Sequence, residues 1–208
     1  MKLTLKKGKA DKVHIMLDGE YKMTVDSAFV ALHNIRDKSE ISESELSLLE
    51  DAVNSRRAFN KAAELLSRRD HSEKELLQKL RQKGYSAGAE EAAEKLREYG
   101  YLDDSRFALS YARELQRLRH FGKRRIEQEL MKKGIERLLI AETVEQLEFS
   151  EEELVALIER KYQKNLESEK GVQKTVNALL RAGYSYSQIK DALSAFSQGQ
   201  YEGDLTDE

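Results

Sequence analysis

The chain has 208 residues with no cysteine and no proline, and its formal net charge is −2. The lack of cysteine excludes disulfides and thiolate metal sites, and no run of about 18 apolar residues predicts a membrane-spanning helix. The N-terminus also lacks the apolar core of a secretory signal. These features fit a cytoplasmic protein that has no membrane association, and we expect a monomer that binds no metal or cofactor.

The charge is unevenly distributed along the chain. Residues 1–57 carry 10 basic and 10 acidic side chains, residues 58–134 carry 18 and 13, and residues 135–208 carry 8 and 15. The middle segment therefore has a balance of +5 and the last segment a balance of −7. A basic middle beside an acidic end predicts that the middle alone contacts a polyanion or an acidic protein groove.

The first residues predict a small β segment. Apolar and polar residues alternate over residues 3–5, 13–17 and 21–25, which is the pattern of half-buried strands. Asp18-Gly19 between the last two runs is a strong hairpin signal. Two or three short strands are only marginally stable alone, so we expect them to pack on the residues that follow.

Three glycines further along end similar amphipathic runs. Gly84, Gly134 and Gly183 lie 50 and 49 residues apart, and each is followed by Tyr or Ile. A glycine at this place predicts a left-handed helix C-cap, and a period near 50 predicts one unit copied in tandem. The predicted fold class is therefore mainly α: a tandem array of three three-helix repeats with a small N-terminal β-hairpin or β-sheet segment.

The periodicity also predicts the domain boundaries. A β-rich extension and a helical linker, which begins at a capping box of Ser42 and Glu45, precede the array. The predicted segments are the extension and linker at 1–57, the repeats at 58–102, 103–149 and 150–197, and an acidic tail at 198–208.

Several local motifs stand in order over residues 58–196. They are Arg68-Arg69-Asp70-His71-Ser72, Glu75-Leu76, Lys83-Gly84-Tyr85, Gly100-Tyr101-Leu102-Asp103-Asp104-Ser105-Arg106-Phe107-Ala108, Gly122-Lys123-Arg124-Arg125-Ile126 and Gly183-Tyr184-Ser185. Together they resemble the RecX family of bacterial regulators of the RecA recombinase. The β-rich N-terminus resembles the extension of the longer members.

The resemblance implies a regulator without enzymatic activity, in the field of recombination, DNA repair and the SOS response. Members of that family bind the RecA–DNA filament, lie in its groove, and suppress strand exchange and the linked ATP hydrolysis. They also bind single- and double-stranded DNA weakly and without sequence preference. These properties come from the resemblance, and neither the composition nor the periodicity predicts them.

Basic residues in and before the second helix of the middle repeat are the candidate site for DNA or the RecA filament. The candidates are Arg106, Arg113, Arg117, Arg119, Lys123, Arg124, Arg125, Lys132 and Lys133. Helical spacing puts Arg106, Arg113 and Arg117 on one face, opposite Phe107, Tyr111 and Leu115, and such a stripe suits phosphate contacts. The alternative is a solvated helix face with intrahelical pairs such as Arg125–Glu129.

The remaining motifs favour structural roles. Asp103-Asp104 before a helix is better explained as an N-cap and a dipole partner than as a metal site. No nucleophile, general base or phosphate-binding loop is visible in the sequence. The alternative function is a stand-alone DNA-binding module of helical repeats without a recombinase partner.

Overall fold

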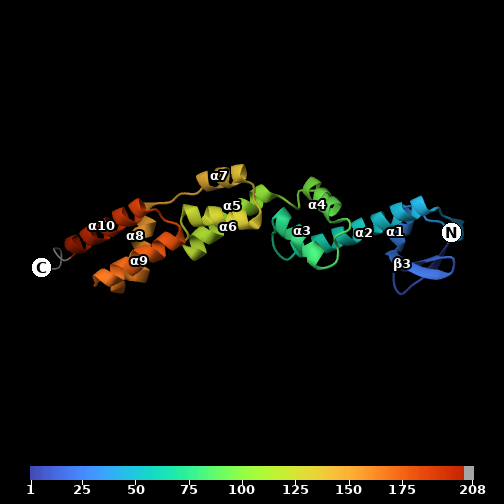
Figure 1. The fold of residues 1–208 in the computed structure, drawn as a ribbon, viewed down its shortest axis with the longest axis horizontal. Helices are drawn as coiled ribbons and strands as arrows, with labels where there is room; N and C mark the ends of the chain where they lie inside the picture. The colour runs from blue at the N-terminus through green and yellow to red at the C-terminus, as the bar shows by residue number, and fades with distance from the viewer. Residues whose placement is uncertain (204–208) are drawn as a thin grey trace. The chain divides into compact units, whose positions relative to one another are not determined.

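The computed structural model describes residues 1–203, with side chains described as far as residue 197. The chain forms two compact units. One consists of residues 1–68 and 77–99, and the other of residues 69–76 and the chain from Gly100 onward. Helices dominate both units, while the strands lie near the N-terminus of the first (Figure 1). The predicted fold class is confirmed.

The N-terminal strands form one antiparallel sheet. The strands are β1 (Lys2–Lys7), β2 (Lys12–Leu17), β3 (Glu20–Asp26) and β4 (Ser39–Glu40), in the order β3-β2-β1-β4. Asp18 and Gly19 both have positive φ angles, of 49° and 93°, as a tight hairpin turn requires. The three predicted strands are confirmed, whereas β4 was not predicted because two residues are too short to show an alternating pattern.

One face of the sheet packs on two helices, α1 (Ser27–Leu32) and α2 (Glu43–Leu66). Leu3, Ile15 and Met23 are buried there against Phe29 of α1 and Leu49 of α2. The predicted capping box is confirmed, because Ser42 accepts from the Glu45 N–H and the Glu45 carboxylate accepts from the Ser42 N–H. The expected support of the strands by the following residues is therefore present.

Helix α2 runs without interruption across the boundary expected at residues 57 and 58. Its first half buries Val53 against the sheet, and its second half buries Ala58 and Ala62 in the first repeat. The same helix therefore joins the β segment to the array.

The first repeat continues with α3 (Glu73–Gln82) and the alanine-rich α4 (Ala89–Glu98). Helix α4 approaches α2 closely, since a Cβ atom added to Gly88 would lie 2.5 Å from the Cα atom of Ser55. Ala89, Ala92 and Ala93 are buried on this helix. Small side chains let two helices pack at short distance, which explains why α4 has few branched aliphatic residues.

Two further three-helix groups make up most of the second unit. The middle group consists of α5 (Asp104–Arg119), α6 (Lys123–Lys133) and α7 (Arg137–Glu145), around a core that includes Phe107, Ile126 and Ile140. The last group consists of α8 (Glu151–Tyr162), the 3-10 turn η1 (Gln163–Asn165), α9 (Glu169–Ala182) and α10 (Tyr186–Gly203).

Helix α10 extends beyond the predicted end of the third repeat. It continues to Gly203, so the first six residues of the expected acidic tail at 198–208 are helical. Residues 204–208 lie outside the described part of the chain.

The three glycine corners have the predicted conformation. The φ angles of Gly84, Gly134 and Gly183 are 82°, 86° and 96°. The N–H of the residue after each glycine donates to a carbonyl five residues earlier, in the pairs Tyr85–Leu80, Ile135–Leu130 and Tyr184–Leu179. These are Schellman-type helix ends.

We expect removal of residues 1–41 to leave a folded helical chain, because the capping box and all of α2 remain. Removal of residues 1–56 should unfold the first repeat, because it also deletes Ser55, whose hydroxyl donates to the Glu91 carboxylate of α4. Circular dichroism during urea unfolding of both truncated proteins checks this. Equal helicity per residue and equal unfolding midpoints would contradict the structural role of α2.

Candidate nucleic-acid interface

Helix α5 presents its arginines on one face because the opposite face is buried. Asp103 caps the helix by accepting from the Ser105 and Arg106 N–H groups, at 2.9 and 3.0 Å. Phe107 and Leu115 are each only 6% exposed. Positions seven and eleven residues apart return to the same side of a helix, so Arg106, Arg113 and Arg117 all point away from this core.

These three arginines line a groove of about 1090 Å³ between α5 and α8. The fourth arginine of the groove is Arg160 of α8. Apolar side chains and two carboxylates also contribute to it: Leu109, Leu118, Ala156, Leu157, Glu114 and Glu153. The groove therefore combines four guanidinium groups with apolar surface and has more positive than negative charge.

Arg160 was not among the residues predicted from the sequence. It lies in the acidic last third of the chain, where no run of basic residues draws attention to it. The fold brings it to α5, where its guanidinium lies 2.9 Å from Nε2 of His120. No local pattern could have predicted this contact, because the two residues are 40 positions apart.

The side chains of Arg119, Lys123 and Arg124 are exposed and make no hydrogen bond or ion pair with any residue the structure describes. Lys123 and Arg124 occupy the first turn of α6, which has no acidic residue and no side-chain N-cap. Cations at a helix N-terminus are unfavourable, by about 0.3–1 kcal/mol each. An unfavourable placement of this kind is typical of residues at functional sites.

The last three candidates are held by other side chains. Arg125 and Lys132 each lie 2.9 Å from the Glu129 carboxylate. Lys133 lies 2.6 Å from Glu75 and 5.1 Å from the centre of the Tyr111 ring. The intrahelical pair Arg125–Glu129 that the sequence left as an alternative is therefore present.

The contact between Lys133 and Glu75 also affects the pKa of the Glu75 carboxyl group. Burial tends to raise the pKa of Glu75, but hydrogen bonds from Lys133 and Arg69 outweigh it and lower the pKa overall. The negative charge of Glu75 is thus stabilised by Lys133, which ties the start of α3 to the end of α6. This is a structural role for Lys133.

The two aspartates at the start of the second repeat cap different helices. Asp103 caps α5, whereas the Asp104 carboxylate accepts from the Glu73 N–H of α3 at 2.8 Å. Over the described residues there is no group of three or more His, Cys, Asp or Glu side chains that could hold a metal ion. Within the same residues, no helix is both long and apolar enough to cross a membrane.

His120 connects the groove to the junction with the third repeat. Burial lowers its pKa, and the nearby Lys161 and Arg160 lower it further. The folded state therefore favours neutral His120. This stabilisation is fully present above the unfolded-state pKa of 6.5 and is lost as the pH falls below it.

We expect the free energy of unfolding to fall between about pH 7.5 and about pH 5.5, and to fall less in His120→Asn. Asparagine is a suitable replacement because His120 has a φ angle of 54°, which asparagine tolerates. Urea unfolding at a series of pH values measures both proteins. Parallel pH profiles would show that His120 does not titrate in this range.

Each of the three three-helix groups matches a family model of its own. The models described as RecX first, second and third three-helix domain match residues 58–96, 103–144 and 150–193. Regulatory protein RecX of Caldanaerobacter subterraneus subsp. tengcongensis is 32% identical over 192 residues, which are 91% of this chain and 96% of that protein. The chain belongs to the RecX family.

Other RecX proteins agree with this assignment. Regulatory protein RecX of Bacillus licheniformis is 31% identical over 208 residues, which cover 98% of this chain and 78% of that protein. A crystal structure of a regulatory protein RecX superimposes with a TM-score of 0.69 and 24% identity, over 91% of this chain and 98% of that one. This structural likeness supports the fold.

Proposed function

We propose that this RecX protein is a non-enzymatic regulator that binds the RecA–DNA filament as a monomer in the cytoplasm. On binding, it inhibits ATP hydrolysis and strand exchange by RecA. The observation that carries the proposal is the groove between α5 and α8, in which Arg106, Arg113, Arg117 and Arg160 lie together. The exposed Arg119, Lys123 and Arg124 would extend this basic surface.

The chemistry of the groove fits a polyanion. Arginine presents a planar fork of donors that suits phosphate, and it remains charged at any physiological pH. Arg106 and Arg117 are eleven residues apart, about 16 Å along the helix, so several consecutive phosphates of one strand can be neutralised together. Each neutralised phosphate releases counterions, which makes the binding favourable and sensitive to salt.

The acidic segments restrict where a polyanion can lie. Helix α7, the segment after it and the start of α8 carry exposed carboxylates, at Glu142, Glu145, Glu148, Glu151 and Glu152. These charges repel phosphate. We therefore expect bound DNA to be confined to the arginines of the groove and the start of α6. Arg125, Lys132 and Lys133 contribute less to binding, because each is already paired with a carboxylate.

Binding measurements separate regulation of RecA from simple DNA binding. Fluorescence anisotropy would compare the affinity for labelled single-stranded DNA with the affinity for the same DNA coated by RecA and ATP. A filament regulator binds the coated DNA at least about tenfold more tightly, a difference of ~1.4 kcal/mol. Equal affinities, or tighter binding to naked DNA, would favour the stand-alone DNA-binding module.

A further inference from the structure

The repeats join to one another through a similar contact at two places. The Ser72 hydroxyl donates to the Lys133 carbonyl at 2.6 Å, and the Gly122 N–H donates to the Ala182 carbonyl at 2.8 Å. Each acceptor is the residue just before a corner glycine. Each donor stands just before the second helix of the preceding repeat, α3 or α6. The corner of a repeat thus receives the N-terminus of a helix.

Further contacts hold the docked helix in both corners. Next to Gly134, the Glu75 carboxylate in the first turn of α3 pairs with Lys133 at 2.6 Å. Next to Gly183, the Tyr184 hydroxyl donates to the His120 carbonyl at 3.2 Å. A small residue, Ser72 or Gly122, makes the contact with the corner carbonyl in each case. A Cβ atom added to Gly122 would lie 2.7 Å from the carbonyl carbon of Gly183.

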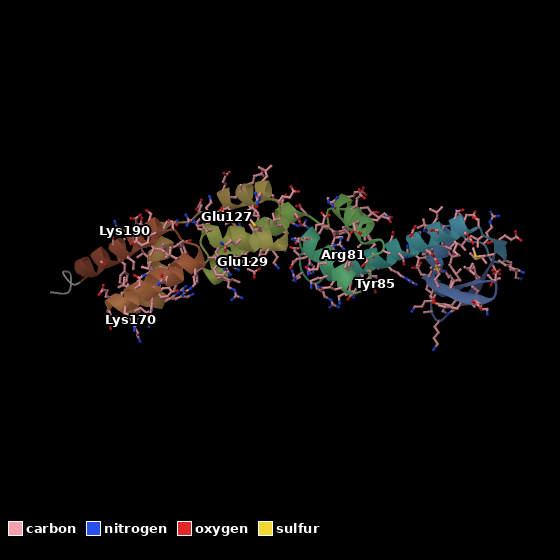
Figure 2. The ribbon with its side chains drawn as sticks, viewed as in Figure 1. Arg81, Tyr85, Glu127, Glu129, Lys170 and Lys190 are labelled. Carbon is pink, nitrogen blue, oxygen red and sulfur yellow. The ribbon has the colours of Figure 1, made fainter. Side chains whose placement is uncertain are left out.

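The corner of the first repeat combines one part from each of the other two corners, and no described residue occupies it. Lys83 corresponds to Lys133 in sequence, and Tyr85 corresponds to Tyr184. The Lys83 carbonyl, the Lys83 ammonium and the Tyr85 hydroxyl have no hydrogen-bond or ion-pair partner among the described residues. A Cβ atom added to Gly84 would meet no atom within 4 Å. Figure 2 labels Tyr85 and Arg81 of this corner.

The neighbouring charges leave Lys83 available. Arg81 is paired with Glu90 at 2.7 Å. Lys83 helps to lower the pKa of Glu64, but the hydrogen bond from Lys61 is the largest cause. Glu64 is already paired with Lys61 at 2.6 Å and with Arg68 at 2.7 Å. The ammonium of Lys83 can therefore pair with an external carboxylate as Lys133 pairs with Glu75.

We propose that the corner at Lys83, Gly84 and Tyr85 docks the N-terminus of a helix from the RecA protein in the filament. The docked helix has serine or glycine as its N-cap and a carboxylate in its first turn. Its cap donates to the Lys83 carbonyl, its carboxylate pairs with the Lys83 ammonium, and a carbonyl before the helix accepts from Tyr85. This docking site rests on the proposed function, because it takes the filament as the partner.

The described part of the chain does not itself supply this helix N-terminus. The helix of the third repeat that corresponds to α3 and α6 is α9, and its start is closed by its own chain. A Cβ atom on Gly171, in the first turn of α9, would lie 2.8 Å from the carbonyl carbon of Asn165, so the chain before α9 packs against the start of this helix. A second copy therefore cannot extend the array by placing α9 in this corner.

Two variants of the corner test the proposal by anisotropy on RecA-coated and naked DNA. Lys83→Glu reverses the charge that meets the carboxylate, and we expect affinity for the filament to fall by about tenfold or more. Tyr85→Phe removes one hydrogen bond, and a fall of about threefold is expected. Affinity for naked DNA should not change. Lys170→Glu, at a residue labelled in Figure 2, and Tyr186→Phe are matched controls on exposed side chains of the third repeat.

The outcomes separate the docking site from the proposed function. If the unaltered protein binds the filament and Lys83→Glu binds it equally well, the corner is not a docking site. If Lys83→Glu weakens binding to naked DNA by the same factor, the corner contacts nucleic acid, which also overturns the proposal. If the unaltered protein prefers naked DNA, the proposed function fails together with the docking site.

Crosslinking identifies what occupies the corner. Gln82 is exposed beside Lys83, and p-benzoylphenylalanine in its place would react with whatever lies against the corner in the assembled filament. Mass spectrometry should locate the crosslink in the first turn of a RecA helix. A crosslink to DNA, or to a second copy of this protein, would overturn the proposal.

Discussion

Reversing three charges in the groove, by Arg106→Glu, Arg113→Glu and Arg117→Glu together, is expected to weaken binding to RecA-coated DNA by about 100-fold. Each exposed phosphate contact is worth ~1 kcal/mol, and three such contacts amount to roughly two orders of magnitude in affinity. The same change should lower the slope of log affinity against log salt by about 0.7–0.9 for each phosphate that is no longer neutralised. Anisotropy titrations at several salt concentrations measure both quantities.

A control variant with the same number of charge reversals separates the effect of the groove on affinity from the effect of net charge. Lys164, Lys170 and Lys174 are exposed residues of the third repeat outside the groove. Changing all three to Glu alters the net charge equally, and we expect it to weaken binding far less. Circular dichroism should show unchanged helicity in both proteins. Equal falls in affinity for the two triple variants would mean that the groove is an ordinary solvated surface.

Gly183→Ala is expected to destabilise the protein by about 3 kcal/mol or more, whereas Gly84→Ala should cost about 1 kcal/mol. Both glycines have positive φ angles, so both variants strain the backbone. Only Gly183 is packed: an added Cβ atom there would lie 2.6 Å from the Cβ and 3.0 Å from the Cα of Arg125, with no such neighbour at Gly84. Urea unfolding gives the two free energies.

Gly183→Ala should also disturb the structure of the groove. Gly183 lies where the N–H of Gly122 meets the third repeat, and the groove is formed by helices of the second and third repeats, α5 and α8. Displacing Arg125 therefore loosens the surface that we propose binds DNA. If the two glycine variants unfold at the same urea concentration, Gly183 is not tightly packed against Arg125.

Local sequence signals predicted the parts of the fold that short segments determine. A glycine at the end of an amphipathic run fixes a helix end by its own backbone preference, so the corners at Gly84, Gly134 and Gly183 could be recognised. The Asp18-Gly19 turn and the Ser42–Glu45 capping box are local in the same sense. The common face of Arg106, Arg113 and Arg117 follows from helical spacing alone.

Contacts between distant segments could not be predicted in this way. The pair of Lys133 with Glu75 joins residues 58 positions apart, and that of Arg160 with His120 joins residues 40 apart. Lys133 was therefore expected to be available for binding, although the fold pairs it with a carboxylate. Arg160 was not predicted, although the fold places it in the groove. The contact of a corner with a helix start of the preceding repeat also became visible only with the packing.

The most direct measurement of the central claim is the rate of ATP hydrolysis by RecA on single-stranded DNA, followed while this RecX protein is added. We predict that the rate falls steeply at protein concentrations too low to bind naked DNA, and that strand exchange stops over the same range. The triple Glu variant of the groove should need roughly 100-fold more protein for the same inhibition. An unchanged rate of hydrolysis at concentrations that saturate naked DNA would contradict the account.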